Sequence, residues 1–447
     1  MLFRSQFLRH NAIFMIGAIS VGFLNYAFYP IMGRVLEPIA FGEVQVLFSL
    51  FTQITIFLGV LSLLTVSIVA NYDDHTKRDR MVAELEKLAL HVSVILVIVT
   101  AAVSPWLRGF FHFNEALPFV LLAVAVLAGT PLAFRSGFLR GCKKFGLVTI
   151  VGLSASVGNI VFSVGLALAG LGSAGVLAGL AAGQFIAFCL AAFFARKQGL
   201  KTGHAVFSDT IASVKSKAIK NLKKASIDFK LIAPELRYAG LVLVGSLCVT
   251  GLFSLDTVVV KHYFDAGTAG LYAGVATVAR IIFYATASVL QVMLPSVKIQ
   301  AANKSGTGQG NRQLLGKSLA LLLAVGGLPL IVFAVFPDKL IGLLMGHDYT
   351  PYAHLLPWLG LAMLIIAVFN LLIMYHIALR QYAAGIIAVI GIVATFLLIL
   401  AHHQTLDQVV ANICIGSTLS LVLLGAWSSR RLLTRGQPRT QEGGMQT

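Results

Sequence analysis

Long apolar runs alternate with short polar segments along nearly the whole chain of 447 residues. A helix that crosses a bilayer needs about 20 predominantly apolar residues. No run here alternates apolar and polar positions as a barrel strand does, so each run is expected to be a helix with internally paired backbone groups. The pattern predicts twelve spanning helices: Ala12–Gly33, Val44–Ala70, Leu88–Trp106, Leu117–Phe138, Val148–Leu171, Ala174–Ala195, Tyr238–Phe264, Gly270–Ser296, Ser318–Phe336, Ala353–His376, Ala383–Ala401 and Val409–Trp427.

The positive charges predict how these helices are oriented. Alternate segments, beginning with the N-terminal tail and ending with the C-terminal tail, hold 28 of the 34 Lys and Arg residues. Cytoplasmic segments of membrane proteins carry the excess of Lys and Arg. Both termini are therefore predicted to be cytoplasmic.

Composition supports the same fold class. Apolar residues make up 58% of the chain and charged residues only 11%, whereas a soluble domain has about 25% charged residues. The chain is therefore predicted to be an all-α polytopic membrane protein. The net charge of +17 is spread over separate cytoplasmic segments, so it does not indicate a nucleic-acid partner.

A short motif occurs twice and suggests a duplicated architecture. The pattern R-x-x-E-x4-G at residues 34–42 has a counterpart, H-x-x-D-x4-G, at residues 262–270, which lies 228 positions later. We expect two pseudo-symmetric six-helix lobes, at residues 1–195 and 238–429. A basic linker at residues 196–237 would join them, and residues 430–447 would form a cytoplasmic tail.

The linker has two interpretations that the sequence leaves open. Apolar residues recur in it at helical spacing, beside ten Lys and Arg residues. This pattern is typical of an amphipathic helix that lies on the anionic inner leaflet, with membrane lipids as its partners. The alternative is a solvated basic linker that only fixes the topology.

Gly175, Gly179 and Gly183 place small residues on one face of the sixth predicted helix. Small residues allow two membrane helices to approach closely. We expect this face to pack inside the protein, and a subunit interface is the alternative.

Two charged residues lie deep inside predicted spans. At a rise of ~1.5 Å per residue, Asp256 lies ~12 Å and Arg280 ~15 Å from the outer ends of two antiparallel helices. The pair could be a structural ion pair that joins the helices, or it could line a cavity and meet a substrate or a coupling ion. Intramembrane charges are often functional. Lys261, near the outer end of its helix, could extend to the interface or join this site.

The first half contributes neutral and acidic candidates. Asn25 and Gln53 lie within spans, where an amide forms either an interhelical hydrogen bond or a contact with a substrate in the cavity. Arg34, Glu37 and Glu43 crowd the first outer turn, where they could simply be solvated.

A basic rim is predicted at the inner mouth of the cavity. Lys and Arg stabilise anionic oxygens, so the rim could receive a phosphate-bearing head group, although membrane topology alone could also require these charges. The rim comprises Arg135, Arg140, Lys143, Lys144 and Arg380.

Catalytic patterns are missing from the sequence. No His or Glu pair has metal-ligand spacing, and no Ser or Cys has an evident base. Residues 311–318 resemble a phosphate-binding loop, but the first glycine is absent and no soluble strand precedes them. We therefore expect neither an enzyme nor a cofactor.

Several short motifs resemble those of one family. Residues 34–42, R-V-L-E-P-I-A-F-G, are similar to the turn between the first two helices of polysaccharide flippases. Residues 139–146, L-R-G-C-K-K-F-G, resemble the loop between their fourth and fifth helices. Leu-Asp at 255–256, Gly-Leu-Tyr at 270–272 and Pro295 resemble their seventh and eighth helices. The chain thus resembles the Wzx-like group of the multidrug/oligosaccharidyl-lipid/polysaccharide superfamily. It departs from the pattern at Glu37, where the family usually has glycine, and in its long basic central loop.

This resemblance implies a flippase of the bacterial inner membrane. Its substrate would be a polyprenyl-pyrophosphate-linked oligosaccharide or polysaccharide precursor, which a central cavity would expose to each side in turn. Polysaccharide polymerase machinery would be a partner. The alternative is a multidrug or metabolite exporter of the same superfamily.

Overall fold

The computed structural model describes residues 2–71, 75–200, 229–302, 308–379, 381 and 383–434. Every regular element within these ranges is helical. Most of the basic linker, Arg380 and the end of the C-terminal tail lie outside the described residues. The first elements are α1 (Leu2–Val35), α2 (Pro38–Asn71), α3 (His75–Phe110), α4 (Leu117–Gly141), α5 (Phe145–Leu166), η1 (Ala167–Leu171) and α6 (Gly172–Lys197). The others are α8 (Phe229–Tyr263), α9 (Ala266–Ala279), α10 (Ile281–Ala302), α11 (Gly308–Val335), α12 (Pro337–Leu344), η3 (His347–Leu355), α13 (Leu356–Ala378), α14 (Ala383–Ala401) and α15 (Leu406–Thr434).

Ten helices among the described residues are long and apolar enough to cross a membrane. One of the ten, Phe145–Lys197, contains both α5 and α6. Helix α1 contains the first predicted span, Ala12–Gly33, but is not among the ten. The chain is therefore an all-helical, multi-pass membrane protein.

The structure departs from the predicted helices at two places. The predicted span Gly270–Ser296 is divided into α9 and α10, and Arg280 stands at the break. The short helix α12 was not predicted, because its eight residues form too short an apolar pattern to resemble a span. Both features lie beside the contact region described below.

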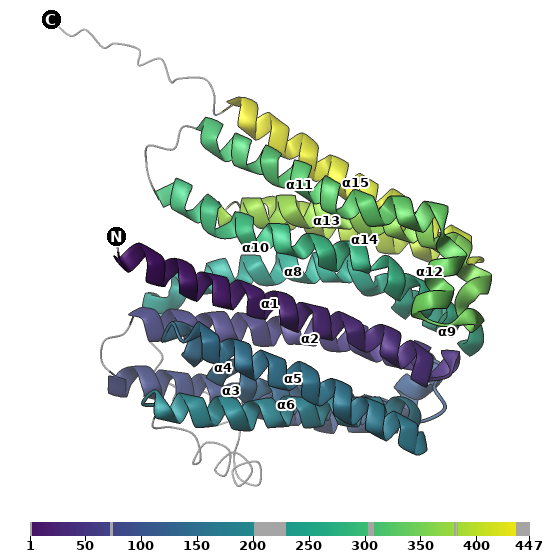
Figure 1. The fold of residues 1–447 in the computed structure, drawn as a ribbon, viewed down its shortest axis with the longest axis horizontal. Helices are drawn as coiled ribbons and strands as arrows, with labels where there is room; N and C mark the ends of the chain where they lie inside the picture. Colours follow the sequence, from purple (N-terminus) through teal and green to yellow (C-terminus); the bar gives the residue numbers. More distant parts are fainter. Residues whose placement is uncertain are drawn as a thin grey trace, which may run out of the picture.

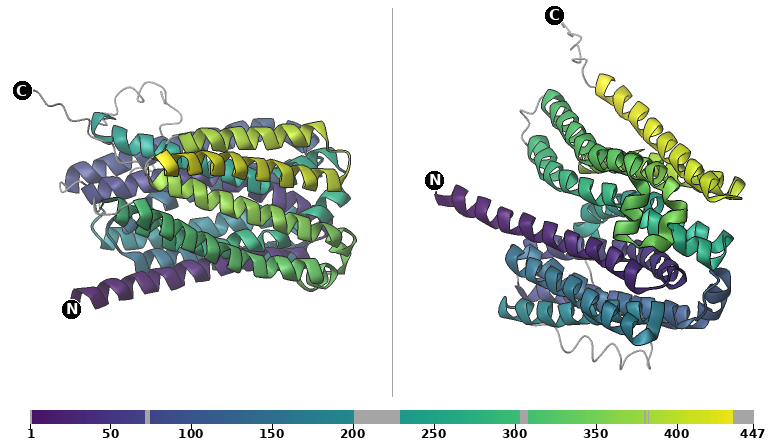
Figure 2. Two further views of the ribbon diagram at one scale, coloured as in Figure 1. Left: turned by 90° about the horizontal axis from the view of Figure 1, so that it is seen from above. Right: turned by 45° about the vertical axis from the view of Figure 1, so that its right-hand side comes forward.

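The helices form two groups (Figures 1 and 2). We call α1–α6 the first helix group and α8–α15 the second helix group. Helix α2 of the first group packs against α8 and α9 of the second, and α1 contacts α10. These five helices bring residues from both halves of the sequence together.

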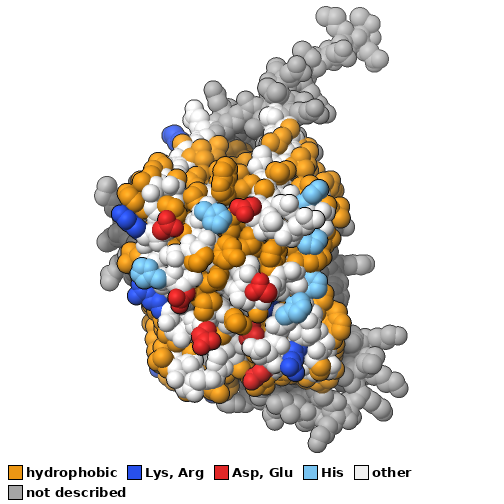
Figure 3. All heavy atoms as spheres, turned by 90° about the vertical axis from the view of Figure 1, so that its right-hand side faces the viewer, with side chains coloured by type: hydrophobic (Ala, Val, Ile, Leu, Met, Phe, Trp, Pro, Cys, Tyr) orange, Lys and Arg blue, Asp and Glu red, His pale blue; other side chains and the backbone are white. Residues whose placement is uncertain are grey.

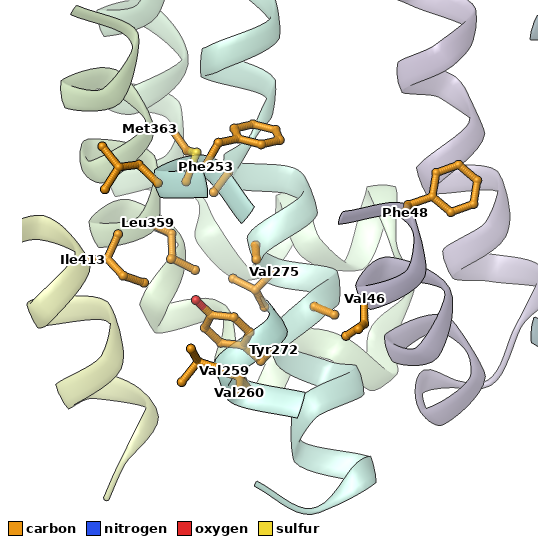
Figure 4. Packing of buried hydrophobic residues seen from close by; sticks show 14 of the residues in the cluster. Val46, Phe48, Phe253, Val259, Val260, Tyr272, Val275, Leu359, Met363 and Ile413 are labelled. Carbon is orange, nitrogen blue, oxygen red and sulfur yellow. The ribbon is translucent and has the colours of Figure 1, made fainter. Parts of the chain in front are cut away.

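The largest buried apolar cluster extends across both groups. Val46 and Phe48 contribute from α2, while Val259, Tyr272 and Val275 contribute from α8 and α9 (Figure 4). Burying an apolar side chain of this size stabilises a packed state by about 1.5–3 kcal/mol in water. Within a bilayer, close contact between side chains takes over much of that role.

The small-residue face on α6 packs inside the protein, as predicted. A Cβ atom added to Gly158 of α5 would lie 3.1 Å from the Cα atom of Gly183. A Cβ atom on Gly179 would overlap the backbone of Ser163 in the same way. The missing side chains allow α5 and α6 to approach at backbone distance.

The two ends of the molecule differ in charge. The end that bears α9 and α12 carries Asp, Glu and His side chains and few Lys or Arg side chains (Figure 3). Exposed Arg140 lies in the last turn of α4, and exposed Lys143 and Lys144 lie on the connection to α5. These residues adjoin the opposite end of α4 from Leu117.

Candidate substrate pocket between the helix groups

Asp256 and Arg280 form a buried ion pair, as their predicted depths allow. The Arg280 Nη2 atom lies 2.9 Å from the Asp256 Oδ1 atom, and the side chains are 6% and 1% exposed, respectively. The Tyr272 hydroxyl donates a hydrogen bond of 3.0 Å to the other Asp256 oxygen. Arg280 also donates to the Thr257 hydroxyl. These contacts join α8, α9 and the break before α10, all within the second helix group.

Arg280 also lines a pocket between the two helix groups. The pocket is lined by Tyr29, Gln45, Phe48, Ser49 and Thr52 of the first group and by Phe253, Ser254, Thr277, Arg280 and Tyr284 of the second. Asp256 does not line it. The two residues are therefore an ion pair, of which Arg280 lines the pocket.

The pocket presents hydrogen-bond donors without partners. Arg280 Nε and Gln45 Nε2 are buried, and neither has a hydrogen-bond partner in the described part of the chain. Buried donors normally find an acceptor. The guanidinium carbon of Arg280 lies 5.1 Å from the centre of the Phe253 ring. Hydroxyls, amides and aromatic rings thus surround a cation, a chemistry that suits a polar, ring-bearing ligand.

The pocket is narrow in this conformation. Its free space is on the order of one water molecule. Tyr26 and Tyr284 come together across the two groups, with ring centres 5.9 Å apart. A large ligand therefore requires the groups to separate.

The two predicted amides form interhelical contacts. Gln53 Nε2 lies 3.4 Å from the Ser254 hydroxyl oxygen of the other group, at the edge of the pocket. Asn25 Oδ1 accepts a hydrogen bond of 2.7 Å from Ser156, within the first group. Gln53 thus contacts Ser254, a residue of the pocket wall, whereas Asn25 contacts α5.

Two expectations about charged residues at the outer turn are wrong. Lys261 does not extend to the interface, because it is 1% exposed. Glu43 is not solvated, because it is 4% exposed and accepts a hydrogen bond of 2.6 Å from Ser173. Residues distant in sequence cover both side chains: Ser173 lies against Glu43, and Phe113 lies against Lys261.

The described residues of the predicted basic rim are in two different environments. Arg135 is 3% exposed and forms an ion pair of 3.0 Å with Glu86 of α3. Arg140, Lys143 and Lys144 are exposed at the end of α4 and on its connection to α5. Arg135 therefore belongs to the interior of the first group, and three cations remain available at the surface.

Sequence patterns missed several pocket residues. Tyr29, Gln45 and Tyr284 line the pocket, but a tyrosine or an amide in a span has too many common roles to be selected without a tertiary contact. The signal that did exist was their proximity in sequence to the repeated turn and to Arg280.

The two groups are in close contact near the repeated motif. A Cβ atom on Gly42 would lie 2.8 Å from the Cα atom of Gly270, so the two equivalent glycines lie against each other. His262 Nδ1 lies 2.8 Å from the Phe110 carbonyl oxygen across the groups. Asp265 is the N-cap of α9, and its hydrogen bonds with Thr268 hold the pKa of that carboxyl below its usual range.

Comparisons with known proteins agree with this architecture. A protein structure described as an inward-facing multidrug resistance MATE family transporter of the MOP superfamily matches with a TM-score of 0.67 and 14% identity, covering 95% of this chain and 100% of its own. The lipid II flippase MurJ, in an inward closed conformation, matches with a TM-score of 0.68 and 14% identity, covering 94% and 89%. A MATE transporter of Vibrio cholerae, VcmN, matches with a TM-score of 0.62 and 13% identity, covering 97% of each chain.

These structural matches show a shared fold. No curated protein sequence matches significantly. A sequence model of the family described as "Polysaccharide biosynthesis protein" matches residues 8–298, which is more than half of the chain. The chain therefore belongs to this polysaccharide biosynthesis protein family and has the fold of MOP-superfamily transporters and flippases.

Proposed function

We propose that this protein is a flippase for a polyprenyl-pyrophosphate-linked oligosaccharide or polysaccharide precursor in the bacterial inner membrane. It moves the precursor from the cytoplasmic to the outer face by alternating access. The main observation that supports this proposal is the position of Arg280, which Asp256 holds in the wall of a polar pocket between the two helix groups. Family membership supports a substrate from polysaccharide biosynthesis.

The mechanism uses the two helix groups as two lobes of six spanning helices each. Residues 1–195 and 238–429 form the lobes, with both termini in the cytoplasm. Transporters of duplicated design move by rocking their repeats about a site near the midplane. The contact between Gly42 and Gly270 closes one side. The small number of Lys and Arg side chains on this end favours it as the outer face (Figure 3).

The inner surface provides initial capture. Arg140, Lys143 and Lys144 are exposed at the end of α4 and on its connection to α5, where cations attract the pyrophosphate while the lipid tail stays in the bilayer. Arg280 and Gln45 then offer donors to the head group when the lobes separate. Moving one negative charge out of a negative interior releases ~2.3 kcal/mol per 100 mV. Proton or sodium coupling through Asp256 is the competing energy source.

The test is accumulation of the lipid-linked precursor on the cytoplasmic face of a deletion strain. We expect accumulation that the wild-type chain reverses and that a chain with Arg280→Ala does not. Arg280→Lys, which retains the charge but not the Nε donor, is expected to restore export only in part. Normal precursor turnover in the deletion strain would refute the proposal.

The second candidate is a multidrug or metabolite exporter, which the structural similarity to MATE transporters favours. It predicts altered sensitivity of the deletion strain to toxic compounds, with unchanged precursor turnover. The same strain therefore separates the two functions.

A further inference from the structure

Lys261 is a buried cation that the substrate pocket does not use. It lies in the last turn of α8, in the second helix group, and is 1% exposed. Its Nζ atom has no hydrogen-bond partner within the described residues, although an ammonium has three donors. Burying a charge without hydrogen bonds is costly. Other interactions must therefore compensate for its burial at this position.

The compensating groups come from the opposite helix group. The ammonium of Lys261 lies 5.2 Å from the centre of the Phe113 ring, which belongs to the connection between α3 and α4. A cation over an aromatic face is attracted to it. The carboxylate of Glu43, near the start of α2, accepts a hydrogen bond from the backbone amide of Asn114, the residue next to Phe113, so a negative charge lies near the ammonium. The exposed carboxylate of Asp265, on the α8–α9 turn beside Lys261, is a second negative charge near the ammonium.

Glu43 is held firmly within the first helix group. Its Oε2 atom accepts a hydrogen bond of 2.6 Å from Ser173, at the start of α6. Its Oε1 atom accepts one of 3.3 Å from the backbone amide of Asn114. The carboxylate is thus fixed from α6 and from the α3–α4 connection, so it moves with the first group and not with Lys261.

The Glu43 and Lys261 charges lie in the contact region that closes the outer side. Glu43 follows Gly42, which lies against Gly270 of the second group. Lys261 precedes His262, whose ring stacks on Phe110 of the first group with centres 4.0 Å apart. Separating the helix groups at this end would therefore separate Glu43 from Lys261.

We infer that Glu43 and Lys261 form a charged latch that holds the outer side closed, an inference that rests on the alternating access of the proposed function. In the closed state the two charges attract each other in a medium of low dielectric. When the groups separate, water surrounds each charge and their attraction becomes small. Neutralising either residue alone leaves the other charge buried without its opposite charge in the closed state, whereas neutralising both removes most of that cost.

The test is a double-mutant cycle read by the distance between two spin labels. The labels are placed at Leu171 and Gln404, which are exposed in the α5–α6 and α14–α15 connections at the outer end. The background chain has its natural cysteines replaced: Cys142, Cys189, Cys248 and Cys414. Distances are measured by double electron–electron resonance on purified protein in lipid nanodiscs, without substrate.

We expect Glu43→Gln and Lys261→Met each to raise the ratio of long to short distances by about tenfold or more, the size of a coupling of ~1.4 kcal/mol. The double variant is expected to return most of the way to the wild-type ratio. Lys261→Arg, which keeps the charge, is expected to leave the ratio near that of the wild type. If Lys261→Met does not fold, Lys261→Gln completes the same cycle.

Additive effects of the two neutral substitutions, or unchanged distances in both single variants, would overturn the latch. This readout does not depend on the substrate. If the two substitutions are coupled but the deletion strain turns the precursor over normally, the latch is retained and the flippase function is rejected. If the substitutions are additive but the deletion strain accumulates the precursor, the flippase function is retained and the latch is rejected.

Discussion

Replacing Asp256 by Asn should destabilise the protein strongly while hardly changing its shape. The Asp256 carboxylate is 1% exposed and accepts hydrogen bonds of 2.9 Å from Arg280 and 3.0 Å from Tyr272. The amide cannot neutralise the guanidinium, which also donates to Thr257. Removing one partner of a buried ion pair costs about 3–5 kcal/mol, because the other charge stays buried without compensation.

The measurement is the free energy of unfolding in mixed micelles of increasing SDS content. We expect Asp256→Asn to lower it by about 3–5 kcal/mol. The matched control is Asp407→Asn. Asp407 lies 3.6 Å from His354 with both side chains exposed, and its loss should change stability by less than about 1 kcal/mol.

Two outcomes would contradict this reasoning. A change below about 1 kcal/mol for Asp256→Asn would mean that the pair is hydrated in the membrane and that its burial has been overestimated. A second check is the variant that combines Asp256→Asn with Arg280→Met, which should recover part of the lost stability because no charge remains buried. Recovery of stability without recovery of export would separate the structural role of the pair from the role of Arg280 in the pocket.

Two further predictions concern the repeated turn. Gly270→Ala should shift the protein away from the conformation in which Gly42 and Gly270 are in contact, because the added Cβ atom overlaps the Pro38 carbonyl group. The spin-label distances described above measure this shift. The control is Gly59→Ala on α2, where nothing lies within 4 Å of the added Cβ atom, and it should leave the distances unchanged. Asp265→Ala should lower stability by about 1 kcal/mol at neutral pH through loss of the N-cap. Because the Thr268 hydrogen bonds lower the pKa of Asp265 in the folded state, this contribution is present above the unfolded pKa of about 3.9 and is lost as pH falls through the lower folded pKa. The wild type and Asp265→Ala should therefore converge in melting temperature under acidic conditions, and a pH-independent difference would contradict the assignment.

The sequence by itself determined the membrane class, the helical runs and the similar depth of Asp256 and Arg280, which allows them to pair. These features depend on local quantities. Lipid requires every span to satisfy its own backbone, so apolar length alone marks a helix. The fixed rise per residue then gives the depth of each charge. The small-residue face of α6 was predicted for the same reason, since helical spacing alone placed its three glycines on one side.

Only the tertiary structure decided which charges are buried and which residues face one another. Lys261 and Glu43 both stand near helix ends, where sequence position suggests contact with water, yet both are buried. Lys261 lies against Phe113 of the other helix group, and Glu43 is bonded to Ser173 and Asn114 of its own group. Arg135 stands near the C-terminal end of α4, yet Glu86 of α3 pairs with it inside the first group. The pocket likewise combines Tyr29 and Gln45 with residues more than two hundred positions away. Burial and electrostatic environment depend on what other elements cover a side chain, and that is set by helix packing rather than by local sequence.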